Sequence, residues 1–198
     1  MRPQPRHRTH LASGEREMVS KLPFSRPFLL SVVHKNSTAD QATEADIPAI
    51  MAIERTSGFE TVIGRWTEEQ HAAEMAKEGT RYFVLRRGGE VTAFAIIQNL
   101  DNPDLRVHLK RIAATEPGRG SGSRLLECVL LWLFTETKAN RFDLDLFVEN
   151  ERALHTYEKL GFEVEGRLRD YHRSVDGRIR DALIMSILRR DWVRRHRL

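Results

Sequence analysis

A glycine-spaced turn between a strand and a helix constrains this chain more than any other feature. The sequence Pro-Gly-Arg-Gly-Ser-Gly-Ser-Arg-Leu-Leu, residues 117–126, follows the strand-like stretch 105–114 and opens an amphipathic helix. Glycine permits positive φ angles and close approach of the backbone to a ligand. Backbone N–H groups at a helix N-terminus, aided by the helix dipole, bind anions. The segment therefore predicts a phosphate-binding turn in an α/β fold.

The spacing of the glycines decides which kind of nucleotide-binding turn this segment resembles. A Walker loop requires a Gly-Lys-Ser/Thr end, and this loop contains no lysine. The dinucleotide fingerprint fails because Ser123 stands where its third glycine belongs, although Asp143 and Asp145 occupy the expected place of a ribose-binding carboxylate. The chain beyond the turn is too short for the further βα units of a doubly wound domain. A dinucleotide oxidoreductase remains an alternative from another class.

A second segment, residues 148–166, places Asn150 just past a strand, then a short helix, then Gly161 where a left-handed helix cap is expected. Together with the glycine turn, it resembles the GCN5-related N-acetyltransferase (GNAT) family, whose acetyl-CoA loop follows the pattern Gln/Arg-x-x-Gly-x-Gly/Ala. Gly120 and Gly122 match this pattern, whereas Pro117 stands where the family has Gln or Arg. The resemblance covers residues 40–190.

The resemblance implies an α/β fold with a mixed, twisted sheet, flanking helices and a C-terminal β-hairpin. It divides the chain into a poorly ordered basic extension (1–37), an N-acetyltransferase domain (38–190) and an Arg-rich tail (191–198). The residue pattern agrees, because it predicts helices that begin at Asp46 and at the Thr67 capping box, the latter closed by Gly79. It further predicts strands at 82–87, 91–100, 105–114, 142–148, 162–171 and 179–188, and helices at 121–140 and 151–160.

The same resemblance implies an acyltransferase that moves the acetyl group of acetyl-CoA to a primary amine by direct attack in a ternary complex. Tyr157 matches the family tyrosine that protonates the leaving thiolate, and an unperturbed pKa of about 10 keeps a tyrosine protonated for that role. Tyr157 could instead pack in a helical stripe, and Asn150 could serve only as a helix cap. The implied cofactor-binding residues are Ile112, Ala113, Ala114, Arg119, Gly120, Ser121, Gly122, Ser123, Arg124 and Asn150.

The general base is less clearly marked. A branch of the family uses a glutamate where this chain has Arg106, and arginine cannot act as a base. His108, two residues further along the same strand face, is the remaining titratable candidate. Glu54 and Glu60 are candidates for contacting the acceptor amine through water. An α-amino group, with a pKa of about 8, needs no specialised base.

The C-terminal segment bears on the acceptor. It resembles the ribosomal-protein alanine N-acetyltransferase branch through five residues: Arg169, Tyr171, Asp181, Ala182 and Met185. Similar tails occur in enzymes that acetylate polyamines and antibiotic-like amines. The sequence therefore predicts an N-acetyltransferase whose acceptor is a protein N-terminal amine. Its alternatives are a small-molecule amine acetyltransferase and a catalytically silent acyl-CoA-binding regulator.

Composition excludes other classes. The net charge of +4 and the arginines near the C-terminus suit an acidic surface, but no aromatic residues interleave with them as in nucleic-acid-binding motifs. The eight histidines lack metal-ligand spacing, so no metal is expected. No apolar run approaches a membrane span, and the single cysteine, Cys128, cannot form an internal disulfide. We expect a cytoplasmic enzyme, and the sequence leaves its oligomeric state open.

Overall fold

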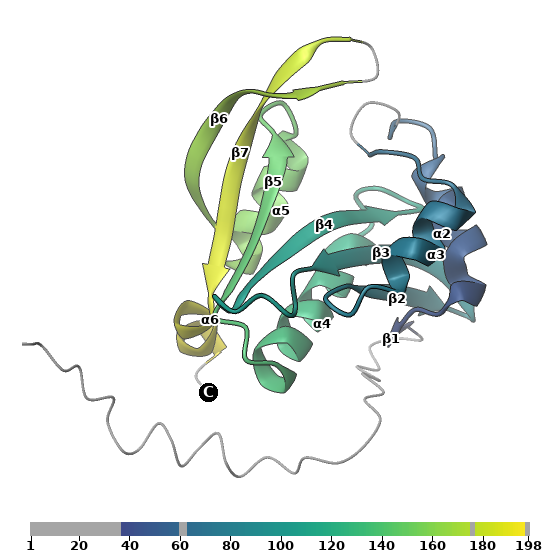
Figure 1. Ribbon diagram of the computed structural model, residues 1–198, viewed down its shortest axis with the longest axis horizontal. Helices are drawn as coiled ribbons and strands as arrows, with labels where there is room; N and C mark the ends of the chain where they lie inside the picture. The colour runs from purple at the N-terminus through teal and green to yellow at the C-terminus, as the bar shows by residue number, and fades with distance from the viewer. Residues whose placement is uncertain (1–36, 60–62, 175–176, 197–198) are drawn as a thin grey trace, which may run out of the picture.

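A seven-stranded mixed sheet organises the protein, in the order β1-β2-β3-β4-β5-β7-β6 (Figure 1). This computed structural model describes residues 37–59, 63–174 and 177–196. Only β4 and β5 are parallel neighbours, and every other adjacent pair is antiparallel. The strands are β1 (Ser37–Gln41), β2 (Arg81–Arg87), β3 (Glu90–Gln98), β4 (Arg106–Ala114), β5 (Arg141–Phe147), β6 (Glu163–Arg173) and β7 (Ile179–Leu188).

Helices cover both faces of the sheet. One face packs against α4, with Phe83 and Ala95 of the strands meeting Leu125 of the helix in a single buried cluster. Neighbouring strand residues point to the opposite face, where Tyr82 and Phe94 pack with α2. The helices are η1 (Glu44–Asp46), α2 (Ile47–Glu54), α3 (Glu68–Met75), α4 (Ser121–Glu136), α5 (Glu151–Leu160) and α6 (Arg189–His196).

Strands β4 and β5 diverge after a short paired stretch. Three residue pairs join them, the last being His108 with Asp143, and no further pair follows along the described strands. A bulge at Lys110 adds to the divergence, because Leu109 and Arg111 pair with consecutive residues of β3. Bulges bend and twist a strand. The C-terminal ends of β4 and β5 therefore leave an opening in the middle of the sheet.

Glycine at position 79 serves packing rather than helix capping. The Thr67 capping box forms as predicted, with the Gln70 N–H donating to the Thr67 hydroxyl at 3.3 Å. Helix α3 ends at Met75, however, so Gly79 is not its cap. A Cβ at Gly79 would collide with the Asp101 side chain. The two loops lie close together here, since the Gly79 carbonyl accepts the Leu100 N–H at 3.0 Å, and a side chain at position 79 would require the exposed Asp101 carboxylate to move.

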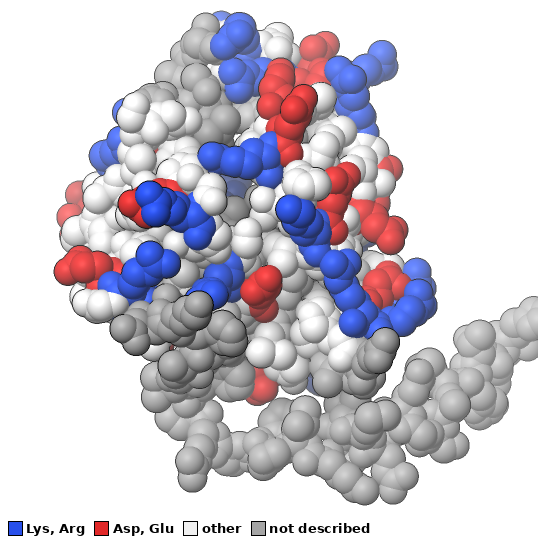
Figure 2. Space-filling model, turned by 180° about the vertical axis from the view of Figure 1, so that it is seen from behind, with Lys and Arg blue, Asp and Glu red and all other residues white. Residues whose placement is uncertain are grey.

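The Arg-rich C-terminus folds back as helix α6. Its Trp192 is only 3% exposed and packs on Phe134 of α4, with ring centroids 5.6 Å apart. Helix α6 thus includes residues 191–196, which the sequence assigns to a tail, while residues 1–36 of the predicted extension lie outside the described part. On the face in Figure 2, Lys and Arg side chains lie among Asp and Glu. In α6 itself, Arg190 and Arg194 both lie within 4 Å of Asp191.

Candidate active site

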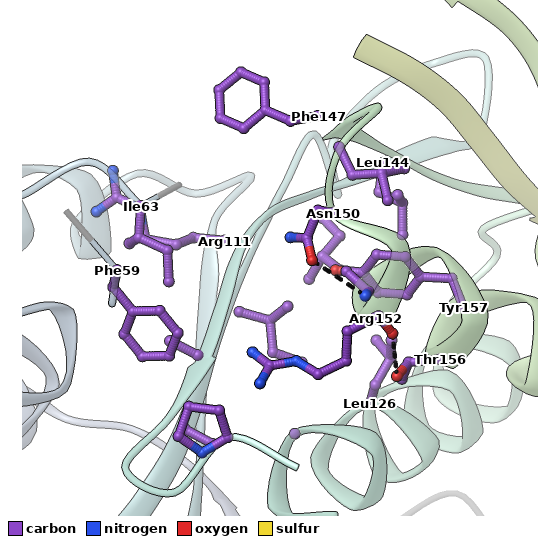
Figure 3. A pocket seen from close by; sticks show the side chains of 18 of the residues that line it. Phe59, Ile63, Arg111, Leu126, Leu144, Phe147, Asn150, Arg152, Thr156 and Tyr157 are labelled. Atoms are coloured by element: carbon purple, nitrogen blue, oxygen red, sulfur yellow. Dashed lines mark hydrogen bonds between the residues drawn. The ribbon is translucent and has the colours of Figure 1, made fainter. Parts of the chain in front are cut away.

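A cavity of about 980 Å³ lies where β4 and β5 diverge (Figure 3). Its walls come from the end of β4, the glycine turn, the first turn of α4, the end of β5, helix α5 and the β6–β7 hairpin. Phe59 and Ile63, from the segment after α2, close one side. Ligand pockets commonly measure roughly 300–1,000 Å³, so this one has room for a large ligand.

The glycine turn presents backbone donors to this cavity. Gly118 and Gly120 have φ angles of 88° and 83°, which an L-residue with a side chain rarely adopts. The first helical hydrogen bond of α4 runs from Arg124 N–H to Gly120 O at 3.0 Å. The N–H groups of residues 121–123 consequently have no carbonyl partner within the helix. The predicted anion cradle is thus present as backbone geometry.

The two arginines of the turn do not line the cavity, whereas its glycines do. The Arg119 side chain is 72% exposed and lies 3.6 Å from Glu116, and it does not line the cavity. Arg124 is half-buried and also lies outside the lining. Ser121, Gly122 and Ser123 do line it. The turn itself therefore contributes backbone amides rather than guanidinium groups to the lining, whereas Arg152 of α5 brings a guanidinium group to the cavity (Figure 3).

The end of β4 forms the wall beside the turn. Ile112, Ala113 and Ala114 pair with β3 along one edge, and all three line the cavity. Beyond His108 the other edge has no strand partner among the described residues. An unpaired strand edge offers N–H and C=O groups to an extended ligand, as an added strand would use them.

Asn150 and Tyr157 face the cavity from α5 (Figure 3). The Asn150 Oδ1 accepts the Ala153 N–H at 3.2 Å and so caps the helix, while its Nδ2 has no acceptor among the described residues. Tyr157 is 8% exposed, and within the described chain no group hydrogen-bonds its hydroxyl. Burial, and then the negative charge of Asp145, raises the pKa of Tyr157 above its ordinary value.

A cluster of charged side chains joins β4 to β5 next to the cavity. The buried Asp143 carboxylate accepts hydrogen bonds from His108 Nδ1 at 2.9 Å, Arg106 Nε at 2.5 Å and Arg141 Nε at 3.1 Å. Burial alone would raise the pKa of Asp143, but these donors outweigh it and hold the pKa well below its ordinary value. Asp143 is therefore a fixed negative charge.

His108 does not line the cavity itself, but it lies next to Asp145, which does. The His108 side chain is 19% exposed and is not part of the lining, whereas Asp145 is. His108 Nε2 lies 3.6 Å from an Asp145 oxygen. Because the ionised Asp143 carboxylate can only accept, Nδ1 of His108 carries a proton, and Nε2 is the nitrogen turned to Asp145.

Glu54 does not line the cavity, although the sequence made it a candidate for contacting the acceptor amine. It is 0% exposed and forms an ion pair with Arg111, and its other oxygen lies 3.3 Å from His71 Nε2. Burial would raise the pKa of Glu54, but His71 and the Arg111 charge lower it below its ordinary value. Glu54 thus holds α2, α3 and β4 together. Glu60, the companion candidate, lies outside the described residues.

Asp145 lines the cavity, although the sequence suggested it only as a ribose-binding carboxylate and not as a residue of an acetyltransferase site. Asp143 and Asp145 are two apart on one strand, which places both on the same face as His108 of the paired strand. This spacing is visible in the sequence. Two carboxylates and a histidine on one face of two neighbouring strands form a charged cluster, which indicates a candidate site for proton transfer. Among the described residues, this cluster included, no group of three or more His, Cys, Asp and Glu side chains could hold a metal ion.

Comparison with known proteins now identifies the family. The model of the acetyltransferase (GNAT) family matches residues 47–162, more than half of the 198-residue chain. The chain belongs to the GNAT acetyltransferase family. The predicted family, fold class and enzyme type are confirmed. No helix in the described residues is long and apolar enough to cross a membrane.

Relatives of known activity fall into two groups. The ribosomal protein bS18-alanine N-acetyltransferase of Escherichia coli (strain K12) is 31% identical over 157 residues, 76% of this chain and 97% of that protein. Its crystal structure has a TM-score of 0.65 and 28% identity, covering 77% of this chain and 93% of that one. The spermidine N(1)-acetyltransferase of the same strain is 26% identical over 148 residues, 69% of this chain and 79% of that protein.

A structure of the second group contains ligands. The spermidine N-acetyltransferase from Vibrio cholerae in complex with CoA and spermine has a TM-score of 0.71 and 20% identity, covering 81% of this chain and 99% of that one. At this identity the likeness extends to the fold alone.

Proposed function

We propose that this GNAT enzyme transfers the acetyl group of acetyl-CoA to the α-amine of a peptide or protein N-terminus. One observation carries the proposal: the lining of a single cavity contains the N-terminal turn of α4, with its unpaired N–H groups, together with the side chains of Tyr157 and Asp145. Phosphate recognition and proton transfer at one site fit a CoA-dependent transfer. The relative that acetylates a ribosomal protein supports the choice of acceptor.

The residues present fit acetyl-CoA. The free N–H groups of residues 121–123 suit the pyrophosphate, and the unpaired edge at Ile112 to Ala114 suits the amide-containing arm. The Asn150 Nδ2 is a further donor to that arm. Bound acetyl-CoA supplies an activated acyl group with a thiolate leaving group. A backbone N–H of the β4 edge is placed to stabilise negative charge on the acyl oxygen.

Tyr157 acts as the general acid in this proposal. Its raised pKa keeps the hydroxyl protonated at neutral and mildly alkaline pH, and its hydroxyl has no competing partner in the described chain. As the C–N bond forms and the C–S bond breaks, Tyr157 gives one proton to the departing sulfur. Solvent then restores the tyrosine proton.

Asp145 acts as the general base, with His108 behind it. Two carboxylates, Glu116 and Asp145, line the cavity in its described part, and Asp145 is the one whose charge acts on Tyr157. Asp145 accepts the proton that the amine loses on acylation. His108 Nε2, 3.6 Å away, is within reach to pass that proton onward, and the hydrogen bond from Nδ1 to Asp143 fixes the orientation of the ring.

A polyamine acetyltransferase is the second candidate, supported by the spermidine-acetylating relative. A polyamine brings several positive charges, and each is costly to bury without a carboxylate. At the acceptor end, Arg111 neutralises Glu54, which leaves Asp145 as the carboxylate that lines the described cavity there. The site therefore favours an acceptor with one amine.

Gly122→Asp tests the cofactor site. Gly122 lines the cavity, and a Cβ at this position meets no protein atom within 4 Å, so the fold tolerates a side chain there. A carboxylate in the first turn suits the helix dipole yet repels phosphate. We expect calorimetric titration with acetyl-CoA to show at least a hundredfold weaker binding, with thermal stability retained.

Gly122→Ala is the matched control, because it adds a Cβ without charge and should bind acetyl-CoA far more tightly than Gly122→Asp. Equal affinity of wild type and Gly122→Asp would overturn the assignment of this turn. Thiol release with free-N-terminus peptides and with spermidine then tests the acceptor. Turnover of spermidine alone would favour the second candidate.

A further inference from the structure

Arg152 is an unpaired cation in the lining of the cavity. It lies in the first turn of α5, and Figure 3 shows its side chain extending from that helix into the cavity, near Thr156 of the same helix and Leu126 of α4. Among the residues that the structure describes, the Arg152 guanidinium has no hydrogen bond and no ion pair. A charged group without a partner beside a large cavity is placed to bind a ligand of opposite charge.

Two other arginines near the cavity are already paired. Arg111 lines the cavity but forms an ion pair with Glu54, and Arg119 lies 3.6 Å from Glu116 outside the lining. Arg152 keeps all of its guanidinium donors for a ligand. A guanidinium group binds phosphate through two parallel N–H donors, a geometry that a lysine does not offer.

The face of α5 that lines the cavity carries positive charge. Arg152, His155 and Lys159 follow one another at intervals of three and four residues, which places them on one face of the helix, and all three line the cavity. Glu151 and Glu158 of the same helix do not line it. A ligand against this wall therefore meets the charges of an arginine and a lysine, which favours a negatively charged group.

The glycine turn supplies only part of the charge that a pyrophosphate needs. The N–H groups of residues 121–123 belong to a helix N-terminus, which carries about half of a positive charge. A pyrophosphate linkage carries a negative charge on each of its phosphates. Pro117, at the position where the family pattern has Gln or Arg, has no side-chain donor. A full positive charge must therefore come from another element.

Resting on the proposed use of acetyl-CoA, we propose that Arg152 completes the cofactor site by binding the pyrophosphate of CoA from α5. Helix α5 thus supplies the full positive charge that the glycine turn lacks. Arg152 is a cofactor-binding residue, separate from Tyr157 and Asp145, which transfer protons. Its loss should therefore weaken the binding of the cofactor and leave the fold intact.

Arg152→Gln tests this contact. Calorimetric titrations measure the Kd of acetyl-CoA and of acetyl-dephospho-CoA, which keeps the pyrophosphate but lacks the 3′-phosphate. We expect both Kd values to rise about tenfold to hundredfold, the size of a hydrogen bond to a charged group. The thermal midpoint without ligand should not change, because the Arg152 side chain is exposed and has no partner in the described chain.

Arg190→Gln is the matched control. It removes the same charge from α6, where the Arg190 side chain is 75% exposed and lies outside the cavity lining. Its Kd for both ligands should equal that of wild type, and an equal loss in both variants would show an effect of net charge instead of a contact. Arg152→Lys keeps the charge without the planar pair of donors, so its Kd should fall between those of wild type and Arg152→Gln.

Three further results would overturn the inference. Unchanged affinity in Arg152→Gln, with wild type binding acetyl-CoA, removes the contact while the proposed function stands. A loss that occurs with acetyl-CoA and not with acetyl-dephospho-CoA assigns Arg152 to the 3′-phosphate instead of the pyrophosphate. Wild type that binds neither ligand removes both the proposed cofactor and the inference that rests on it.

Discussion

Tyr157 is a buried tyrosine that lines the same cavity as Asp145, and its proposed role can be removed without disturbing its ring. The ring packs on Phe162 with centroids 5.7 Å apart. Tyr157→Phe keeps that packing, so fold and acetyl-CoA affinity should be retained while kcat falls by about 10²- to 10⁴-fold. Steady-state kinetics on a peptide acceptor measures this, with KM changing little.

The pH profile gives the Tyr157 prediction a second readout. Burial and the Asp145 charge raise the pKa of Tyr157, and an acid with a raised pKa keeps its proton as the pH rises. The wild-type rate should therefore not decline between about pH 8 and pH 10 through loss of this proton. Equal activity of wild type and Tyr157→Phe would mean that solvent or another residue protonates the thiolate.

Asp145 and His108 can be separated by a pair of variants. Asp145→Asn removes the proposed base, and we expect kcat at pH 7 to fall about 10²-fold and to recover as the pH rises and the amine loses its proton unaided. His108→Gln leaves Asp145 in place and should cost less. A larger loss in His108→Gln than in Asp145→Asn would make His108 the base, as the sequence alone suggested.

Two arginines of the C-terminal helix bind the ends of other helices, which composition alone does not reveal. Arg189 donates to the carbonyl oxygens of Phe134, Thr137 and Ala139, which lie at or just beyond the C-terminus of α4. Arg195 likewise donates to Lys159 O near the end of α5, at 2.5 Å. Cations at helix C-termini also interact favourably with the helix dipole. Two of the residues in the Arg-rich stretch are therefore structural.

Arg189→Ala should accordingly destabilise the protein by about 2 kcal/mol, because several carbonyl groups lose a charged donor at once. Arg190→Ala is the control, since the Arg190 side chain is 75% exposed and lies 3.8 Å from Asp191. Urea unfolding of both variants measures the difference. Equal midpoints would contradict the capping role.

Local patterns predicted the glycine turn and the helix that follows it, because both depend on neighbours in sequence. The Asn150 cap, which the sequence left as an alternative to cofactor binding, is local in the same way. The acceptor end depends on distant contacts. Glu54 meets Arg111 across 57 positions, and no local pattern shows that this pairing removes Glu54 from the cavity.

The charged cluster around Asp143 links the two halves of the sheet where they still pair. It joins Arg106 and His108 of β4 to Asp143 of β5, and Arg141 of β5 continues it to Glu165 of β6. Beyond this point β4 and β5 separate. The cluster therefore sits at the base of the opening, and its loss should affect the stability of the whole fold.

The pH dependence of unfolding tests that role. The pKa of Asp143 is depressed in the folded state, so its contribution is present above its unfolded pKa of about 3.9 and is lost as the pH falls through the folded value. At pH 7, Asp143→Asn should reduce the free energy of unfolding by about 3 kcal/mol, because Arg106, Arg141 and His108 lose the buried carboxylate that they share. Below about pH 4 the difference from wild type should shrink. Urea unfolding from pH 7 to pH 3 measures both, with exposed Asp104→Asn as the control, and a pH-independent difference would contradict the ionised role of Asp143.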